Sequence, residues 1–147
     1  MKVVQLSISD GGIPKRPIAV AQLTRAGIKG DAWAHPKIHG GPDQAVLLIT
    51  QEGLEALISQ GFPLFPGALG ENITTQGLDP GTLRTGQRYR IGEASIELTK
   101  PREPCHTLDV YGKGIRRAIL ANPGLTGFYA KVTEPATVHA GDEISVG

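Results

Sequence analysis

Short stretches in which apolar and polar positions alternate recur along the chain, and this pattern predicts strands. At the N-terminus Val3 or Val4, Leu6 and Ile8 follow a period of two. Residues 45–50 are continuously apolar, which indicates a buried strand. The stretches on either side of Gly92-Glu93 suit a two-residue hairpin. The strands that we expect cover residues 1–9, 17–24, 45–50, 72–75, 87–91, 94–99, 127–133 and 137–146.

Two stretches show helical spacing instead. In residues 51–60 the apolar positions recur three and four residues apart, with Thr50 as a plausible N-cap and Gly61 as the end. Residues 114–121 form the second expected helix, which ends at Asn122-Pro123-Gly124. The 20 glycines and 11 prolines are scattered, so they indicate many turns rather than a disordered tract.

Strands that outnumber helices and are joined by hairpins favour a closed or half-closed β-barrel. We therefore predict a fold that is mainly β with α (α+β), with a few helices outside the barrel. The length of 147 residues fits one domain that covers 1–147.

Charge and cysteine content narrow the classes of function. The net charge of +1 gives no reason to expect nucleic acid or a membrane surface as a partner. The single cysteine excludes an internal disulfide and suits a reducing compartment. The N-terminal stretch lacks the features of a signal peptide, so we expect a cytoplasmic protein.

Cys105 is the first candidate for chemistry. It lies in Pro-Arg-Glu-Pro-Cys-His, where two prolines disfavour helix and place the thiol on a stiff loop. Lys100, Arg102 and His106 are close in sequence, and neighbouring cations favour the thiolate, the form that binds metals or attacks sulfur. The alternative is an inert buried cysteine, which this charged segment does not favour. A Cys-His nucleophile pair with His39 or His106 also stays open.

A second candidate is the glycine-rich stretch that begins at His39. Gly40 and Gly41 could let backbone N–H groups approach an anion, with Lys37 and His39 as further donors. The alternative is an ordinary tight turn with a surface histidine.

Two further clusters offer polar groups. Asn72 and Thr74, in Gly-Glu-Asn-Ile-Thr-Thr, could provide neutral hydrogen bonds to a pterin ring or a phosphate. Arg88 and Arg90 share one face of a strand and could contact phosphate. The alternatives are a strand edge with solvent-facing threonines and a solvated strand face.

Taken together, several segments resemble the MOSC domain, named after the C-terminal domain of molybdenum cofactor sulfurase, and above all its short stand-alone bacterial YiiM-type members. The likeness keeps its order over most of the chain. The matching segments are GIKGD at 27–31, HGGPDQAV at 39–46, GENITTQGL at 70–78, GQRYRIGEASIELTKPREPC at 86–105 and GFYAKVTEPATVHAGDEI at 127–144.

This resemblance implies a MOSC-type β-barrel-like fold and molybdenum cofactor (molybdopterin) as the ligand, with Cys105 bound to the metal. By similarity to amidoxime-reducing enzymes it favours a molybdenum-dependent oxidoreductase that reduces N-hydroxylated small molecules. The expected residues are Cys105, Arg102 and His39 for catalysis, and Lys37, Gly40, Gly41, Asn72, Thr74, Arg88, Arg90, Lys100 and His106 for the cofactor.

An external electron donor protein or flavoprotein is the implied partner, and a homodimer is compatible with the sequence. The alternative function is a carrier of molybdenum cofactor or of persulfide sulfur that turns over no small molecule. Pyridoxal phosphate, which descriptions of the family also mention, is not expected, because in the sulfurases it belongs to a separate domain.

Overall fold

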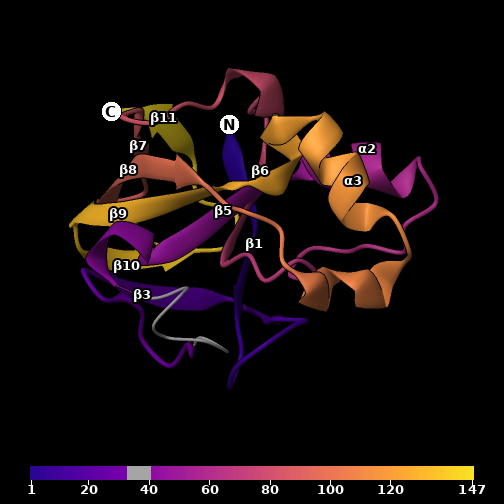
Figure 1. Cartoon of the computed structure of the whole chain (residues 1–147). Coiled ribbons are helices and arrows are strands. Elements are labelled where there is room, and N and C mark those ends of the chain that lie inside the picture. Colours follow the sequence, from indigo (N-terminus) through magenta and orange to yellow (C-terminus); the bar gives the residue numbers. More distant parts are fainter. Residues whose placement is uncertain (33–40) are drawn as a thin grey trace.

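The computed structural model describes residues 1–32 and 41–147, and within these residues eleven strands form two sheets (Figure 1). The large sheet has the order β11-β7-β8-β9-β5-β6-β1-β2, and the small one has the order β10-β3-β4. The strands are β1 (Lys2–Ile8), β2 (Arg16–Ile18), β3 (Val20–Thr24), β4 (Gly27–Ile28), β5 (Val46–Thr50), β6 (Ile73–Gln76), β7 (Arg88–Ile91), β8 (Ala94–Pro101), β9 (Phe128–Glu134), β10 (Ala136–His139) and β11 (Ile144–Val146).

The described helices are short. The α-helices are α2 (Gln51–Ile58) and α3 (Ile115–Ala121), and the 3-10 turns are η1 (Pro42–Gln44), η2 (Pro80–Thr82), η3 (His106–Tyr111) and η4 (Pro123–Thr126). Both predicted helices are confirmed, as is the fold class, which is mainly β with a few helices. None of the described helices is long and apolar enough to cross a membrane.

The large sheet curves back on itself without closing into a barrel. No continuous ladder joins its two edge strands among the described residues. The start of β1 nevertheless lies beside the turn before β11, since Ile144 N donates to Met1 O over 2.8 Å and Val3 N donates to Asp142 O over 2.9 Å. The sheet therefore has the barrel-like curvature that we expected, but it does not close into a complete barrel.

Two predicted strands are each divided in the structure. Residues 17–24 split at Ala19, because β2 pairs with β1 whereas β3 pairs with β10 in the small sheet. Residues 137–146 split at Gly141, whose φ of +93° belongs to the turn in which Asp142 N donates to His139 O. In both cases the two halves pair with different strands, which a local alternation pattern does not reveal.

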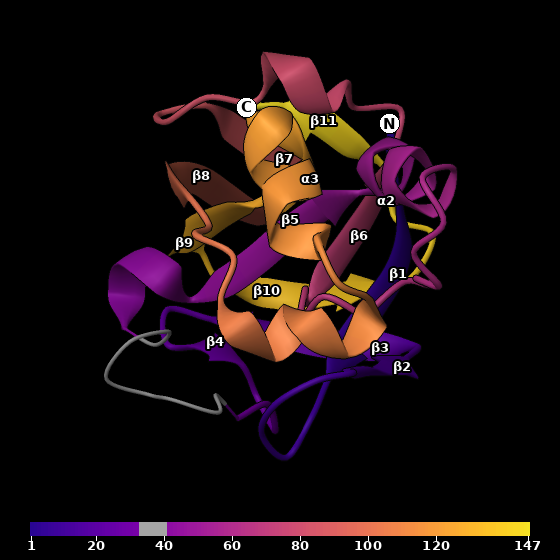
Figure 2. The same ribbon diagram turned by 45° about the vertical axis from the view of Figure 1, so that its right-hand side comes forward.

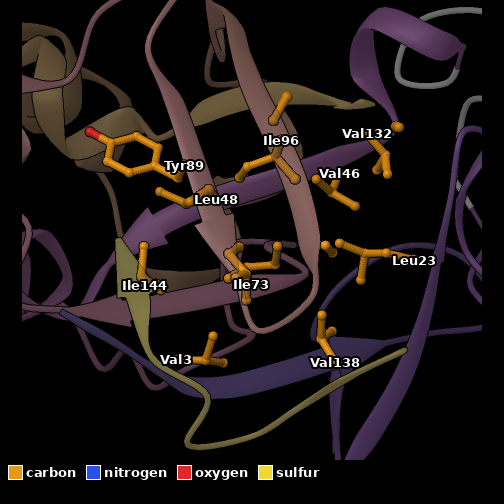
Figure 3. Close-up of a cluster of buried hydrophobic side chains, with 14 of the residues drawn as sticks. Val3, Leu23, Val46, Leu48, Ile73, Tyr89, Ile96, Val132, Val138 and Ile144 are labelled. Carbon is orange, nitrogen blue, oxygen red and sulfur yellow. The ribbon is translucent and has the colours of Figure 1, made fainter. Parts of the chain in front are cut away.

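Strand β5 explains why the sequence has a continuous apolar run. Val46 and Leu48 point into one core cluster, which lies inside the curved sheets (Figure 3). Leu47 and Ile49 point into a second cluster on the opposite face of the large sheet. A strand that is covered on both faces has no solvent side and therefore no polar alternation.

The second cluster is closed by α2 and α3, which lie on the same side of the large sheet (Figures 1 and 2). Helix α2 buries Leu54 and Leu57, and α3 buries Ile115 and Ile119. The predicted N-cap is confirmed, because Thr50 Oγ1 accepts a hydrogen bond from Gly53 N over 2.9 Å. The turn η3, which follows β8, completes this layer through the buried side chain of Leu108.

Candidate functional site

A half-open pocket of about 300 Å³ lies where the segment after β8 meets four other parts of the chain. These parts are the loop between β1 and β2, the loop before β6, the start of β5 with η1, and the start of β9. The lining combines apolar walls with a few polar groups. The lining residues are Gly12, Ile13, Lys15, Gln44, Leu47, Leu69, Gly70, Asn72, Arg102, Cys105, Thr107, Leu108 and Tyr129.

Cys105 is the N-cap residue that directly precedes η3, and it is half-buried at the pocket. Its carbonyl oxygen accepts a hydrogen bond from Leu108 N over 3.1 Å, which holds the Cys105 backbone against the first turn of η3. Cys105 Sγ lies 2.8 Å from Thr107 Oγ1, and either atom could be the donor. Cys105 therefore lies at a pocket and belongs to neither core cluster.

Arg102 is the most unusual group in the pocket. Its side chain is 7% exposed, and Nη1 donates to the carbonyl oxygen of Leu69 over 2.8 Å. The other two nitrogens, Nε and Nη2, have no hydrogen-bond partner among the described residues. Burial lowers the pKa of Arg102, and the nearby Tyr129, Glu71 and Cys105 oppose this shift. Buried donors without partners cost free energy, so they indicate a ligand with acceptor atoms.

Glu71, a carboxyl group that is 0% exposed, interacts electrostatically with Arg102. Burial raises its pKa, whereas the backbone N–H groups of residues 71 and 67, the Arg102 guanidinium and Thr74 lower it. Thr74 Oγ1 donates to Glu71 Oε2 over 3.3 Å, while Oε1 has no partner within the described part of the chain. Thr74 therefore supports Glu71 and is not itself a lining residue of the pocket.

Asn72 lines the pocket, but its amide is engaged in the fold. Its Oδ1 accepts from Leu47 N over 3.0 Å, and its Nδ2 donates to Ser7 O and, over 2.8 Å, to Asp31 Oδ2. Asp31 Oδ1 in turn accepts from Lys15 Nζ over 2.7 Å. Asn72 thus ties the start of β6 to β1, to β5 and to a buried ion pair, which holds the pocket wall in place.

The structure does not bring the strand arginines to this pocket. Arg88 Nε is 2.8 Å from Glu97 Oε1, and Lys131 binds the other oxygen of Glu97 over 3.3 Å. These contacts lower the pKa of Glu97, with the hydrogen bond from Arg88 as the largest cause. Arg90 lies 4.0 Å from Glu134 on the same exposed face. Arg88 and Arg90 therefore belong to a solvated strand face, which was the alternative to a phosphate contact.

The remaining predicted residues lie near the pocket or outside the described chain. Lys100 Nζ lies 6.0 Å from the centroid of the Tyr129 ring, and His106 and Gly41 are exposed and do not line the pocket. Lys37, His39 and Gly40, which the sequence suggested as site residues, lie in residues 33–40, outside the described residues.

Sequence reasoning missed three polar residues of the site: Lys15, Asp31 and Glu71. Asp31 ends the matching segment GIKGD, and Glu71 belongs to the matching segment GENITTQGL. Both residues could therefore have been proposed from the family resemblance. A charged residue in the otherwise uncharged stretch around Glu71 is the signal that could have identified it. Lys15 has no comparable local signal, because it becomes buried only when its loop folds against residues 31 and 67.

Comparison with known proteins gives consistent relationships. The model of the MOSC domain family matches residues 35–145. The protein YflK of Bacillus subtilis (strain 168), described as uncharacterised, is 36% identical over 143 residues, which is 93% of this chain and 63% of that protein. YiiM of Escherichia coli (strain K12) is 36% identical over 124 residues, which is 80% of this chain and 55% of YiiM. The chain thus spans 63% and 55% of these two curated relatives.

Solved structures show the same fold. The crystal structure of YiiM from Geobacillus stearothermophilus has a TM-score of 0.80 and 22% identity, and the match covers 99% of this chain and 74% of that one. The structure of YiiM from Escherichia coli has a TM-score of 0.76 and 26% identity, over 100% of this chain and 70% of that one.

Proposed function

This chain belongs to the MOSC domain family, and on that premise we propose that its pocket binds the molybdenum cofactor, with Cys105 as the protein's ligand to the metal. The observation that carries the proposal is that Cys105 and Arg102 line the same pocket. A thiolate is a soft ligand suited to such a metal centre. A buried guanidinium with two nitrogens that have no partner among the described residues is suited to an anionic group of the cofactor.

The residues present fit such a cofactor. The apolar side chains of Ile13, Leu47 and Leu69 offer a wall against which a flat ring can pack, and Arg102 offers N–H groups for a phosphate. No group of three or more His, Cys, Asp or Glu residues that could hold a metal ion occurs in residues 1–32 and 41–147. The proposal accordingly needs only one metal ligand from the protein, since the pterin supplies the others.

When bound, the cofactor would supply the two-electron reduction of an N–O bond in an N-hydroxylated small molecule. The share of the protein is binding, orientation and electrostatics. Thr107 holds the Cys105 side chain in place, while the apolar walls keep water from part of the pocket. An external electron donor protein or flavoprotein would complete the cycle, in the reducing cytoplasm that a lone thiol suits.

A carrier role is the second candidate, and the half-buried state of Cys105 favours it. A thiol that is accessible at the mouth of a pocket could hold a cofactor or a persulfide sulfur and pass it to a partner protein. Such a carrier would need Cys105 but no turnover of a small molecule.

The test of the proposed function is molybdenum content, measured by elemental analysis of protein from a host that makes the cofactor. We expect near-stoichiometric metal in the wild type, loss of metal in Cys105→Ala, and retention in the control Arg88→Gln, whose side chain lies outside the pocket. Turnover of an N-hydroxylated base with an artificial electron donor would then separate the reductase from the carrier. Equal metal in wild type and Cys105→Ala would refute the assignment of the ligand.

A further inference from the structure

One side of the turn η3 leads from the pocket to the surface of the protein. Thr107 lines the pocket, and its Oγ1 lies 2.8 Å from Cys105 Sγ. Side chains three residues apart are eclipsed in a 3-10 helix, so Val110 lies one turn beyond Thr107 on the same side of η3. Val110 is 75% exposed. The rim of the pocket therefore continues into an apolar side chain that faces solvent.

Two aromatic rings extend this apolar surface. The ring of Tyr111, the last residue of η3, meets the ring of Phe65 edge-on, with 6.3 Å between the centroids and 84° between the planes. Phe65 is itself 45% exposed. A Cβ on Gly112 would lie 3.1 Å from Cδ1 of Phe62, so the loop after α2 packs closely against the end of η3. Single exposed apolar side chains are normal, whereas adjoining ones mark an interaction site.

Helix α3 adds positive charge beside these residues. It lies next to η3, which is the turn below it in Figure 2, and Arg116 Nε and Nη2 donate to Asp109 Oδ1 and Oδ2 over 3.0 and 2.9 Å. Lys113 and Arg117 are also exposed, and neither forms an ion pair with a described residue. Residues 106–121 thus contain three cations and one carboxylate, whereas the whole chain has a net charge of only +1. The positive charge is concentrated on this face.

These residues form one surface, which we call the η3–α3 face. Leu120 belongs to it, because it is 66% exposed and follows Arg116 by one turn on the same side of α3. Aromatic and arginine side chains around an apolar centre are typical of protein–protein interfaces. The residues of the η3–α3 face are Phe65, Val110, Lys113, Arg116, Arg117 and Leu120.

We propose that the η3–α3 face is the docking surface for the electron donor of the proposed function, and that this donor is a small flavoprotein with an acidic surface around its flavin. The positive charge of the face suits a partner of opposite sign. The position of the face selects the donor among acidic proteins, because a protein seated on Val110 lies one turn of η3 from the residue that contacts the thiol of Cys105. The inference rests on the proposed function and deepens it.

The donor supplies the electrons that the proposed reaction consumes. Conversion of one N–OH group to N–H breaks the N–O bond, releases one molecule of water, and takes up two electrons and two protons. The electrons come from the reduced flavin, which is oxidised, and the protons come from solvent. Electron-transfer complexes are small and weak, so opposite charges serve mainly to speed association. Association should therefore slow as the salt concentration rises.

Flavodoxin, a small acidic protein that carries flavin mononucleotide, is a suitable probe. We would measure its binding to the intact chain, with and without cofactor, by isothermal titration calorimetry. At low ionic strength the wild type should bind flavodoxin about ten-fold more tightly than at high ionic strength. Absence of binding, or binding that salt does not change, would overturn the proposal.

Val110→Ser tests the apolar part of the face. It should weaken flavodoxin binding about five-fold or more, the loss expected for a residue near the centre of an interface. Val146→Ser is the matched control, because Val146 lies on the edge strand β11 and is 77% exposed. Equal affinities of the two variants would overturn the proposal.

The cations are tested with two double variants that lower the net charge by the same amount. Lys113→Gln with Arg117→Gln should slow the oxidation of reduced flavodoxin by the loaded protein about ten-fold at low salt, while a small artificial reductant still supports turnover at the wild-type rate. Arg88→Gln with Arg90→Gln, on the exposed face of β7, should leave both rates unchanged. Equal slowing by the two double variants would assign the effect to net charge and overturn the proposal.

The two proposals can fail separately. Wild-type protein that never carries molybdenum, but binds flavodoxin more tightly than Val110→Ser does, would refute the cofactor proposal and leave the docking surface standing. Protein that carries molybdenum through Cys105, but whose affinity for flavodoxin is the same in Val110→Ser, would do the reverse. A dimer in sedimentation that Val110→Ser dissociates would assign the face to a second copy of the chain and would also overturn the docking proposal.

Discussion

Lys15 Nζ lies 2.7 Å from Asp31 Oδ1 in the wall of the pocket, and the two side chains are only 8% and 5% exposed. The same carboxylate accepts from Asn72 Nδ2 and from Ser9 N. One buried ion pair thus connects the loop after β1, the segment after β4 and the start of β6. The pocket has this shape because these three segments are held at one carboxylate.

Removal of one partner of this ion pair should destabilise the folded protein. We expect Asp31→Ala to lower the free energy of unfolding by about 3–5 kcal/mol, because it leaves the ammonium of Lys15 buried without a counter-charge. Urea denaturation at neutral pH measures the loss. A second substitution, Lys15→Met, should recover most of it, since no buried charge then remains. A double variant as unstable as Asp31→Ala would contradict this explanation.

The pocket also depends on a glycine whose neighbour leaves no room for a side chain. Gly67 and Gly141 have the same φ of +93°, but a Cβ at Gly67 would overlap the carbonyl oxygen of Lys15, whereas one at Gly141 meets nothing within 4 Å. Gly141→Ala should therefore cost only the left-handed strain, about 1–2 kcal/mol.

Gly67→Ala should cost about 1–3 kcal/mol more than Gly141→Ala, because the overlap adds to the same strain. Unfolding of both variants in urea, side by side, measures the difference. Equal losses would mean that the loop shifts freely to accept the methyl group.

The cap of α2 offers a separate test of the local structure. Thr50→Ala removes the acceptor for Gly53 N and should lower the free energy of unfolding by about 1 kcal/mol. Thr50→Ser keeps the hydroxyl oxygen and should retain most of the stability. Thermal or urea unfolding distinguishes the two, and similar losses in both variants would assign the effect to the buried methyl group instead.

Glu71 should make stability depend on pH. Burial raises its pKa in the folded protein above the value of the unfolded chain, so between these two values the folded state holds more protons. The wild type therefore loses stability as the pH rises through this window. Glu71→Gln has no group to titrate there, so its stability relative to the wild type should increase with pH. Parallel profiles of wild type and Glu71→Gln would show that Glu71 does not titrate in this window.

Much of the secondary structure could be predicted because its causes are local. The hairpin between β7 and β8 forms around Gly92-Glu93, with Ile91 paired to Ala94, as the turn residues indicated. The cap at Thr50 and the apolar spacing in α2 also act within a few residues. The prediction of two continuous strands, over residues 17–24 and 137–146, was wrong because the cause of the division is not local. Ala19 and Gly141 mark the points where the chain changes its pairing partner, and pairing is decided by distant residues.

By itself the sequence determined the class of fold, the family resemblance, and the stiff segment that carries Arg102 and Cys105, because alternation, turn residues and prolines act on their immediate neighbours. Only the tertiary structure decided which polar groups share a pocket. It left two nitrogens of Arg102 without partners in the described chain, buried the carboxyl group of Glu71, and engaged Arg88 with Glu97 on an exposed strand face. Burial and hydrogen-bond satisfaction are set by segments far apart in sequence, so no local pattern of residues contains them.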